Sequence, residues 1–320
     1  MKKNRLFFFG YAFFCVLFIF TVLEIGARVI LRDRYNRDER NLCYAYDPVL
    51  GWFPEKNSQN IFKSTKDILV HHNSRGFRDK EIDADKRHAR VAFLGDSFVW
   101  GYDVAAEERF TEKLRGRLGD AEVINMGISG FSTDQELLLL MREWNYVKPD
   151  FVFLMVCGND RSGNSSNMEY GYYKPYFLLK DDRVRLQGIP VPKNAMYCLK
   201  DLGYGLNHSS LAMMVLKIIE NLKEGRHFSH SKLQVPDPTA ALIEEMNIFL
   251  HKKQVGFAVA MVDADEPLAR FCRTQGIPVL DLAFDGETFR FLSNGRHWNE
   301  KGNARVAELV QQFLKNATVF

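Results

Sequence analysis

The sequence lacks a strong excess of charge of either sign. Its 320 residues include 43 Lys and Arg against 40 Asp and Glu, which gives a formal net charge of +3. Proteins that bind nucleic acid present a concentrated basic surface, so we expect no nucleic-acid partner. Hydrophobic residues make up 46% of the chain, and the length suits one large domain or two.

Cysteine is sparse, at five residues, and no two cysteines form a CxxC pair. The eight histidines show no metal-ligand spacing, and no glycine-rich phosphate loop is present, so we predict neither a metal nor a nucleotide cofactor. Cys157 ends a very apolar run and is expected to behave as a small buried residue. Whether any of Cys43, Cys198 and Cys272 form a disulfide is left open.

The one long hydrophobic run lies at the amino terminus, at residues 6–23, and contains no charged residue. Roughly 20 apolar residues are needed for a helix to cross a bilayer. A cleavable signal peptide would usually have a shorter apolar region followed by a small-residue cleavage site, which the sequence does not offer. We therefore predict an uncleaved transmembrane anchor at residues 6–30, after a short tail at residues 1–5. Basic residues flank the run on both sides, so charge does not decide its orientation.

Beyond the anchor, the sequence divides into a lead-in segment at residues 31–88 and a domain at residues 89–320. In the domain, continuous apolar runs alternate with helical patterns. This alternation predicts a parallel sheet covered on both faces, and so a three-layer α/β/α sandwich. The expected strands are residues 90–94, 122–126, 151–157, 256–262 and 277–282, and the expected helices are residues 107–118, 133–144 and 299–315, the last with Asn299 as its N-cap.

Residues 161–235 interrupt this alternation, and we predict that they form an insertion at the carboxyl edge of the sheet. Within them, residues 175–186 predict a hairpin that turns at Asp181 and Asp182, and residues 210–222 predict a helix. The ligand crevice of such folds lies at this edge. The insertion therefore either shapes a substrate pocket or only covers the sheet.

Three short polar motifs come directly after predicted strands. GDS, ending in Ser97, follows the first strand, Gly127 follows the second in NMGISG, and Asn159 follows the third in CGND. A fourth motif, HWNEKG, begins at His297 and precedes the last helix. Because parallel strands end at one edge of a sheet, we expect the four motifs to meet there.

These residue types suit acyl transfer. A serine hydroxyl becomes a good nucleophile when a histidine takes its proton. The resulting oxyanion needs donors, which the backbone N–H groups of Ser97 and Gly127 and the side-chain amide of Asn159 could supply. Asp96 is expected to bond loop N–H groups and hold the nucleophile turn. Each motif alone is a weak signal, but the four in order favour a serine-histidine site.

On these residues the chain resembles the SGNH hydrolase family, also called GDSL esterases, which is named for a Ser, Gly, Asn and His in four separated blocks. The resemblance covers roughly residues 89–160 and 256–316, and the lead-in motif NSRGFRDKE resembles membrane-tethered bacterial members. It implies a flavodoxin-like sandwich of about five parallel strands. It also implies an extracytoplasmic, periplasmic domain that hydrolyses or transfers acyl groups on esters, often acetyl groups on sugars.

One position departs from the family pattern. The family places an Asp three residues before the histidine to orient its ring, and here that position is Asn294. In serine proteases, Asp to Asn at the orienting position lowers the rate about 10⁴-fold. The alternatives are a catalytic dyad of Ser97 and His297, a low activity, or a substitute carboxylate such as Asp281 or Asp285.

The sequence thus favours a membrane-anchored serine esterase or O-acyltransferase that acts through an acyl-enzyme on a glycan or lipid-linked sugar. A second hypothesis, favoured by Asn294, is a non-catalytic glycan-binding or assembly protein that kept the fold. A third is a phospholipase at the bilayer, with an aromatic cluster facing lipid, although such clusters are more often packed core. That cluster comprises Tyr170, Tyr172, Tyr173, Tyr176 and Phe177.

Overall fold

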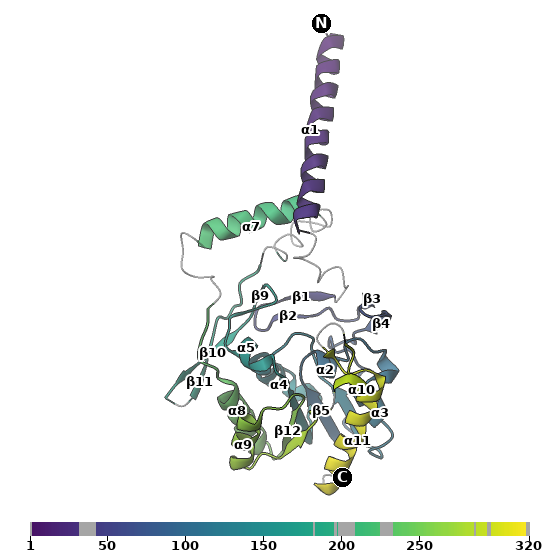
Figure 1. Cartoon of the computed structure of the whole chain (residues 1–320), viewed down its shortest axis with the longest axis vertical. Helices are drawn as coiled ribbons and strands as arrows, with labels where there is room; N and C mark the ends of the chain where they lie inside the picture. The colour runs from purple at the N-terminus through teal and green to yellow at the C-terminus, as the bar shows by residue number, and fades with distance from the viewer. Residues whose placement is uncertain are drawn as a thin grey trace. The chain divides into compact units, whose positions relative to one another are not determined.

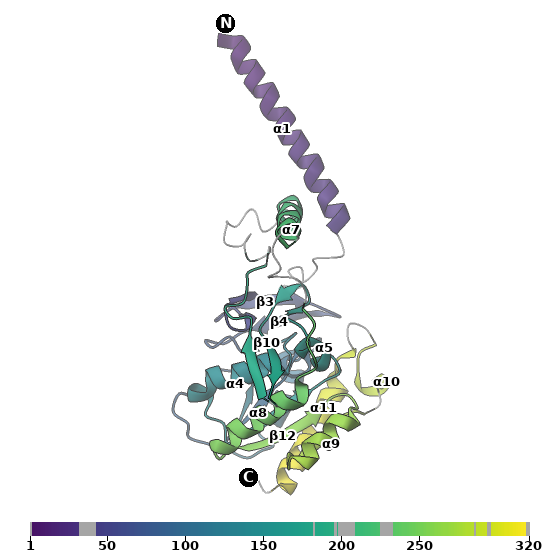
Figure 2. The same ribbon diagram turned by 90° about the vertical axis from the view of Figure 1, so that its left-hand side faces the viewer.

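The chain divides into two compact units. The first takes in Met1–Glu39 and Lys193–Ser231, and the second takes in Arg40–Pro192 and Lys232–Phe320, so the chain passes between the units three times. Figures 1 and 2 show the elements of both units. The computed structural model describes residues 2–31, 43–181, 183–194, 197, 209–224, 233–284, 286–292 and 296–317.

The first unit contains two long helices, α1 (Lys2–Leu31) and α7 (Ser210–Glu224), of which α7 was expected at residues 210–222. Within α1, Phe7–Ile30 is a candidate membrane span with a mean hydropathy of 2.2, and its most apolar 18-residue window is not buried inside the protein. A helix satisfies its own backbone hydrogen bonds, so it is the form that such an apolar run takes in lipid. Membrane spans and signal sequences both have this form.

The second unit is built on a five-stranded parallel sheet in the spatial order β13-β12-β7-β5-β6. Read in chain order, this is the 2-1-3-4-5 arrangement of flavodoxin-like folds. The predicted fold class and all five predicted strands are confirmed. The strands are β5 (Arg90–Leu94), β6 (Glu122–Asn125), β7 (Phe151–Val156), β12 (Gly256–Met261) and β13 (Val279–Asp281).

Helices cover both faces of the sheet (Figure 1), which is why the central strands β5 and β7 are buried at every residue. On one face, α3 (Phe110–Leu114) and α11 (Glu300–Asn316) share a core with the sheet residues Val91, Phe93 and Phe153. On the other face, α4 (Thr133–Val147) contacts β5 and α8 (Thr239–Lys252) contacts β12. The remaining helices of this unit are α2 (Ser97–Trp100), α5 (Asp160–Asn164), α9 (Glu266–Thr274) and α10 (Gly286–Phe289).

The prediction of one continuous helix at residues 107–118 is wrong. A short 3-10 helix at Ala106–Glu108 and α3 take its place, separated by the extended residue Arg109. The Arg109 guanidinium is buried and donates to the carbonyl of Arg78, so a tertiary contact overrides the helical pattern. By contrast, the closing helix α11 begins as expected, with the Asn299 side chain accepting from Gly302 N.

The lead-in segment belongs to the same compact unit as the sheet. It forms two antiparallel hairpins that the sequence did not predict. Of the predicted insertion, only residues 193–231 group with α1, and the expected hairpin around Asp181 is confirmed. The strands of these hairpins and of a further short pair are β1 (Tyr44–Asp47), β2 (Gly51–Pro54), β3 (Gln59–Lys63), β4 (Asp67–His71), β8 (Met168–Glu169), β9 (Tyr172–Tyr173), β10 (Tyr176–Lys180) and β11 (Arg183–Gln187).

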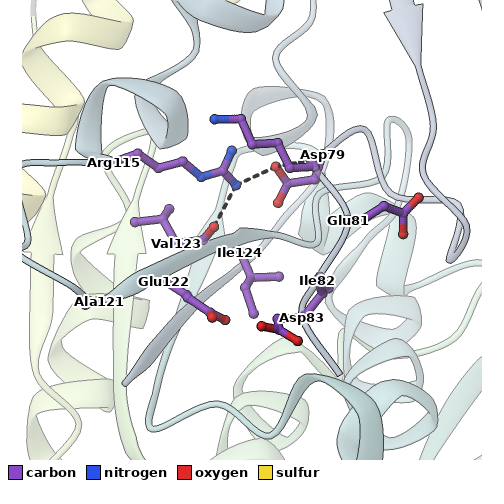
Figure 3. Close-up of a pocket in the computed structure, with 10 residues that line it drawn as sticks. Asp79, Glu81, Ile82, Asp83, Arg115, Ala121, Glu122, Val123 and Ile124 are labelled. Atoms are coloured by element: carbon purple, nitrogen blue, oxygen red, sulfur yellow. Dashed lines mark hydrogen bonds and ion pairs between the residues drawn. The ribbon is translucent and has the colours of Figure 1, made fainter. Parts of the chain in front are cut away.

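Asp79 of the lead-in segment and Arg115 cover the outer edge of strand β6. Asn125 N donates to Asp79 Oδ2 at 2.8 Å, and Val123 O accepts from Arg115 Nη2 at 2.7 Å. Asp79 and Arg115 form an ion pair at 2.5 Å, beside a cavity of about 320 Å³ (Figure 3). The pair occupies backbone groups that an edge strand would otherwise offer to another strand.

Candidate active site

Ser97 is the first residue of α2 and follows β5 through Gly95 and Asp96. As expected, Asp96 holds this turn, because its Oδ1 accepts from Phe98 N at 2.9 Å and so caps the helix. A Cβ on Gly95 would overlap the side chain of Val99. The turn is therefore tight, and it leaves Ser97 half-buried at the carboxyl edge of the sheet.

His297 meets Ser97 across 200 residues of sequence, with Nε2 2.8 Å from Ser97 Oγ. The imidazole ring is 9% exposed and lies between Tyr102, at a centroid distance of 4.4 Å, and Phe98, at 5.1 Å. Packing on both sides fixes the plane of the ring and keeps its Nε2 directed at the serine. Its neighbour Trp298 is buried and packs against Phe98 as core.

Asp103 lies behind the histidine. Its Oδ2 is 3.1 Å from His297 Nδ1, and its side chain is fully buried. Ser97, His297 and Asp103 thus form the hydrogen-bonded chain of a catalytic triad. Within the described part of the chain, the second oxygen of Asp103 has no hydrogen-bond partner. The side-chain hydrogen bonding of Asp103 there is thus directed to the imidazole of His297.

Asp281, one of the two carboxylates considered from the sequence, does not fill this position. Asp281 is exposed, and its Oδ1 accepts from Ala283 N at 2.8 Å. Asn294 and Asp285 lie outside the described residues. The acid next to His297 therefore comes from the nucleophile loop, six residues after Ser97.

The backbone of Asp103 has φ +68°, a left-handed conformation that Asp tolerates better than most non-glycine residues. The loop around it is held by Arg78, whose Nη1 donates to Gly101 O at 2.5 Å and whose Nη2 donates to Val104 O at 2.9 Å. The Arg78 guanidinium also stacks on the Trp100 ring at 4.6 Å. A buried arginine from the lead-in segment thus positions the acid of the triad.

Asn159 lies beside the nucleophile. Asp96 Oδ2 is 3.4 Å from both Asn159 Nδ2 and Ser97 Oγ, so one carboxylate oxygen joins the two residues. The Cys157 thiol contacts Asn159 Oδ1 and Asp96 Oδ2, and Cys157 is buried as expected. The oxygen of the Asn159 amide thus contacts the Cys157 thiol, and the nitrogen of the amide contacts Asp96 Oδ2, the same atom that Ser97 Oγ contacts.

Gly127 packs against the nucleophile helix, because a Cβ at this position would overlap the backbone of Trp100. Its N–H donates to Asn125 Oδ1 at 2.9 Å. In this structure the donor expected to hold the oxyanion is therefore engaged within its own loop. The glycine lets the β6 loop approach the nucleophile closely.

Acidic side chains gather next to these residues. Asp160 accepts from Cys157 N and Thr133 N, both at 2.8 Å, which ties the β7 loop to the start of α4. Burial, followed by the nearby Asp96 charge, raises the pKa of Asp160 to about 7. Burial, followed by Asp160 and Asp96, raises the pKa of Glu136 well above its ordinary value. Both effects act against the charged form of Glu136, because a further negative charge here would be buried among other carboxyl groups.

The described residues contain no group of three or more His, Cys, Asp or Glu that could hold a metal ion. Cys157 and Cys272 carry free thiols, and Cys198 lies outside the described residues. The site brings together a hydroxyl, an imidazole, a carboxylate and an amide, at Ser97, His297, Asp103 and Asn159.

Comparison with known proteins places these residues in one family. The model described as the GDSL-like Lipase/Acylhydrolase family matches residues 93–305, which is more than half of the chain and contains all four sequence blocks. A comparison with curated proteins finds no match.

Several solved structures are similar to this chain. One is a member of the lipolytic protein G-D-S-L family from Veillonella parvula DSM 2008, with 13% identity over 71% of this chain and 98% of that chain and a TM-score of 0.40. Another is an acetyl xylan esterase, with 13% identity over 70% of this chain and 99% of that chain and a TM-score of 0.41. The family match and the fold agree, and the chain therefore belongs to the GDSL-like lipase/acylhydrolase family, a family of carboxylic ester hydrolases.

Proposed function

We propose that this protein is a membrane-anchored serine esterase or O-acyltransferase with Ser97 as nucleophile, His297 as base and Asp103 as the acid that orients the base. The observation that carries the proposal is the position of His297, which is 2.8 Å from Ser97 Oγ on one side and 3.1 Å from Asp103 Oδ2 on the other. Histidine between a hydroxyl and a carboxylate is the arrangement that makes serine nucleophilic near neutral pH.

In the first half-reaction, His297 Nε2 takes the proton of Ser97 Oγ while the oxygen attacks the carbonyl carbon of the ester. The new C–O bond pushes the carbonyl electron pair onto oxygen and forms the tetrahedral oxyanion. Asp103 accepts the Nδ1–H and stabilises the imidazolium. Collapse of the intermediate expels the alcohol, which takes the proton from His297 and leaves an acyl-enzyme on Ser97.

In the second half-reaction, water or a sugar hydroxyl attacks the acyl-enzyme, again with His297 taking its proton. The intermediate collapses with Ser97 Oγ as leaving group, and His297 returns the proton to it. Water gives hydrolysis, and a sugar hydroxyl gives transfer. Both outcomes use the same side chains, so the acceptor site decides between them.

The oxyanion requires fixed donors. The Ser97 N–H is the first of helix α2 and has no acceptor within the helix, and the Asn159 amide nitrogen lies on the same side of Asp96. The Gly127 N–H, which donates to Asn125 Oδ1, would join them only by exchanging that bond for one to the substrate. We therefore assign the main donor roles to Ser97 and Asn159.

The presence of Asp103 bears on the rival hypotheses. A non-catalytic role was favoured because Asn294 brings no charge to the histidine, and Asp103 now supplies that charge. Asn294 is then free of the orienting role that its place in the sequence suggests. The phospholipase hypothesis relied on an exposed aromatic cluster, but Tyr173 and Phe177 are buried and only Tyr170 of that cluster is exposed.

We further propose that α1 is an uncleaved anchor, that the second unit is extracytoplasmic, and that the ester lies on a glycan or lipid-linked sugar. The length and hydropathy of Phe7–Ile30 support the anchor. The periplasmic placement and the class of substrate rest on the resemblance to membrane-tethered family members.

A fluorophosphonate probe tests the central role of Ser97. We expect the probe to label the full-length protein and to leave Ser97→Ala unlabelled, with turnover of p-nitrophenyl acetate lost in both Ser97→Ala and His297→Ala. A folded wild-type protein that resists the probe and does not turn over the ester, yet binds glycan equally well in both variants, would support the non-catalytic hypothesis instead.

A further inference from the structure

Helix α7 is attached to helix α1 through one carboxylate. Glu24 Oε2 accepts from Ser209 Oγ at 2.8 Å and from Leu211 N at 3.0 Å, and Glu24 Oε1 accepts from Ser210 N at 2.9 Å. Glu24 also pairs with Arg28 at 2.9 Å. The carboxylate thus caps the amino terminus of α7 and favours its helix dipole, so the start of α7 lies at the level of Glu24 on α1.

Glu24 is the first charged residue after the apolar run of α1, at residues 6–23. A helix of roughly 20 residues crosses the hydrocarbon core, so Glu24 falls at the boundary between hydrocarbon and headgroups. A charged side chain is costly in the core and is tolerated at this boundary when it is well bonded. The start of α7 is consequently at the membrane surface if α1 spans the membrane.

Four apolar residues of α7 share one face, whereas Met213 falls outside this face and is buried. Leu211, Val215, Ile218 and Ile219 are spaced at i, i+4, i+7 and i+8, the pattern of a single helical stripe. Three of them are exposed, with exposed fractions of 45% for Val215, 50% for Ile218 and 40% for Ile219. The polar residues of this helix stand outside the series, at positions 217, 220, 221, 223 and 224.

The last turns of α1, which follow Glu24, also expose apolar side chains. Ile25, Val29 and Ile30, on the last turns of α1, are each more than half exposed. Figures 1 and 2 show α7 running across the foot of α1 rather than along it. A helix that lies across a membrane span at the boundary level, with a separate apolar face, has the features of an interfacial helix.

We propose that α7 is an interfacial helix whose apolar stripe of Leu211, Val215, Ile218 and Ile219 lies in the headgroup and acyl boundary of the membrane that α1 crosses. This rests on the proposed anchor. Lipid is the occupant that the structure favours, because lipid surrounding α1 at the level of Glu24 is continuous with the stripe. A stripe of four side chains is also far smaller than the area that a stable protein interface buries.

Quenching of an added tryptophan by brominated lipids tests the proposal in the full-length protein. Ile218→Trp is reconstituted in phosphatidylcholine vesicles whose acyl chains carry bromine either near the headgroup or near the bilayer centre. Quenching is measured as the excess over wild type, in which Trp52, Trp100 and Trp298 are buried and the fourth tryptophan, Trp144 on helix α4, is half-buried. Val215→Trp serves as a second reporter should Ile218→Trp fail to fold.

Two further variants separate the possible outcomes. Ile19→Trp, in the middle of the apolar run of α1, reports on the anchor alone, and Ile248→Trp is a matched control because Ile248 is an exposed isoleucine on helix α8 of the second unit. We expect shallow bromines to quench the Ile218→Trp variant at least twice as strongly as deep bromines. Deep bromines should quench the Ile19→Trp variant, and neither lipid should quench the Ile248→Trp variant beyond wild type.

Quenching at position 19 without quenching at positions 218 and 215 would overturn the interfacial helix and leave the anchor intact. A blue-shifted emission at position 218 that neither lipid quenches would mean that protein, such as a second copy of this chain, covers the stripe, and it would also overturn the proposal. Absence of quenching at position 19 would remove the anchor and the interfacial helix together, while the active-site proposal would stand.

Discussion

Asp103 and His297 lie 3.1 Å apart, between Oδ2 and Nδ1, although 194 residues of sequence separate them. The acid therefore reaches the histidine from the loop that carries the nucleophile. Since Ser97 begins the same loop, the two ends of the triad are fixed by one short segment, and the histidine is placed between them. On the proposed mechanism, the carboxylate beside His297 is Asp103, and it does not come from the position three residues before the histidine.

Asp103→Asn should lower kcat by about 10³–10⁴-fold and leave KM nearly unchanged. The amide preserves the shape of the side chain but removes the charge that stabilises imidazolium and permits the wrong ring tautomer. Steady-state turnover of p-nitrophenyl acetate measures the effect. Asp281→Asn is the matched control and should retain wild-type kinetics, because Asp281 is exposed and bonds its own loop. Equal losses in the two variants would refute the assignment of Asp103.

Asn159→Ala should lower kcat by about 10²–10³-fold with little change in KM, the effect expected for loss of one oxyanion donor. The variant also frees Cys157 from its contact with Asn159 Oδ1, so thermal unfolding is followed alongside the kinetics. A loss of stability with kcat unchanged would assign Asn159 a structural role only.

Arg78→Lys should reduce kcat roughly tenfold or more through displacement of Asp103. Lysine keeps the charge but cannot bind Gly101 O and Val104 O together as the planar guanidinium does. A positioning effect appears in kcat and in its pH profile, whereas a purely structural effect appears only in the melting temperature. Arg87→Lys, at an exposed surface position, is the control and should change neither.

Glu136→Gln should stabilise the protein more at pH 8 than at pH 5. Because the folded-state pKa of Glu136 is raised, the folded protein holds its proton above pH 4.5, where the unfolded chain releases it. The contribution of this group to stability is thus present below about pH 4.5 and is lost as pH rises, and glutamine removes the dependence. Urea unfolding at the two pH values measures the difference, with exposed Glu308→Gln as control. A stabilisation independent of pH would contradict a neutral Glu136.

The sheet could be predicted because its strands are buried on both faces and so read as continuous apolar runs, of which Phe151–Val156 is the clearest. The same runs locate Ser97 and Asn159, which follow two neighbouring strands at the switch point of the sheet. The lead-in hairpins were not predicted, since three of their four strands, β1, β3 and β4, lack the continuous burial of the central strands.

Asp103 could not be found by periodicity, because it lies in an irregular turn with a left-handed backbone. The only available signal was an acidic residue in a short loop directly after the nucleophile helix. The hydrogen bond from the Gly127 N–H to Asn125 Oδ1 likewise could not be predicted from the sequence, because it depends on the side-chain conformation of Asn125. Sequence patterns locate the strand ends, and tertiary contacts then decide which side chains meet.

The most direct test of the account is the mass of peptides from protein quenched during turnover of p-nitrophenyl acetate. We predict an acetyl group on the peptide that contains Ser97, present in wild type, absent in Ser97→Ala and removed from wild type when the ester is exhausted. Turnover by wild type without acetylation of Ser97, or with the acetyl group on another residue, would contradict the assignment of Ser97 as nucleophile.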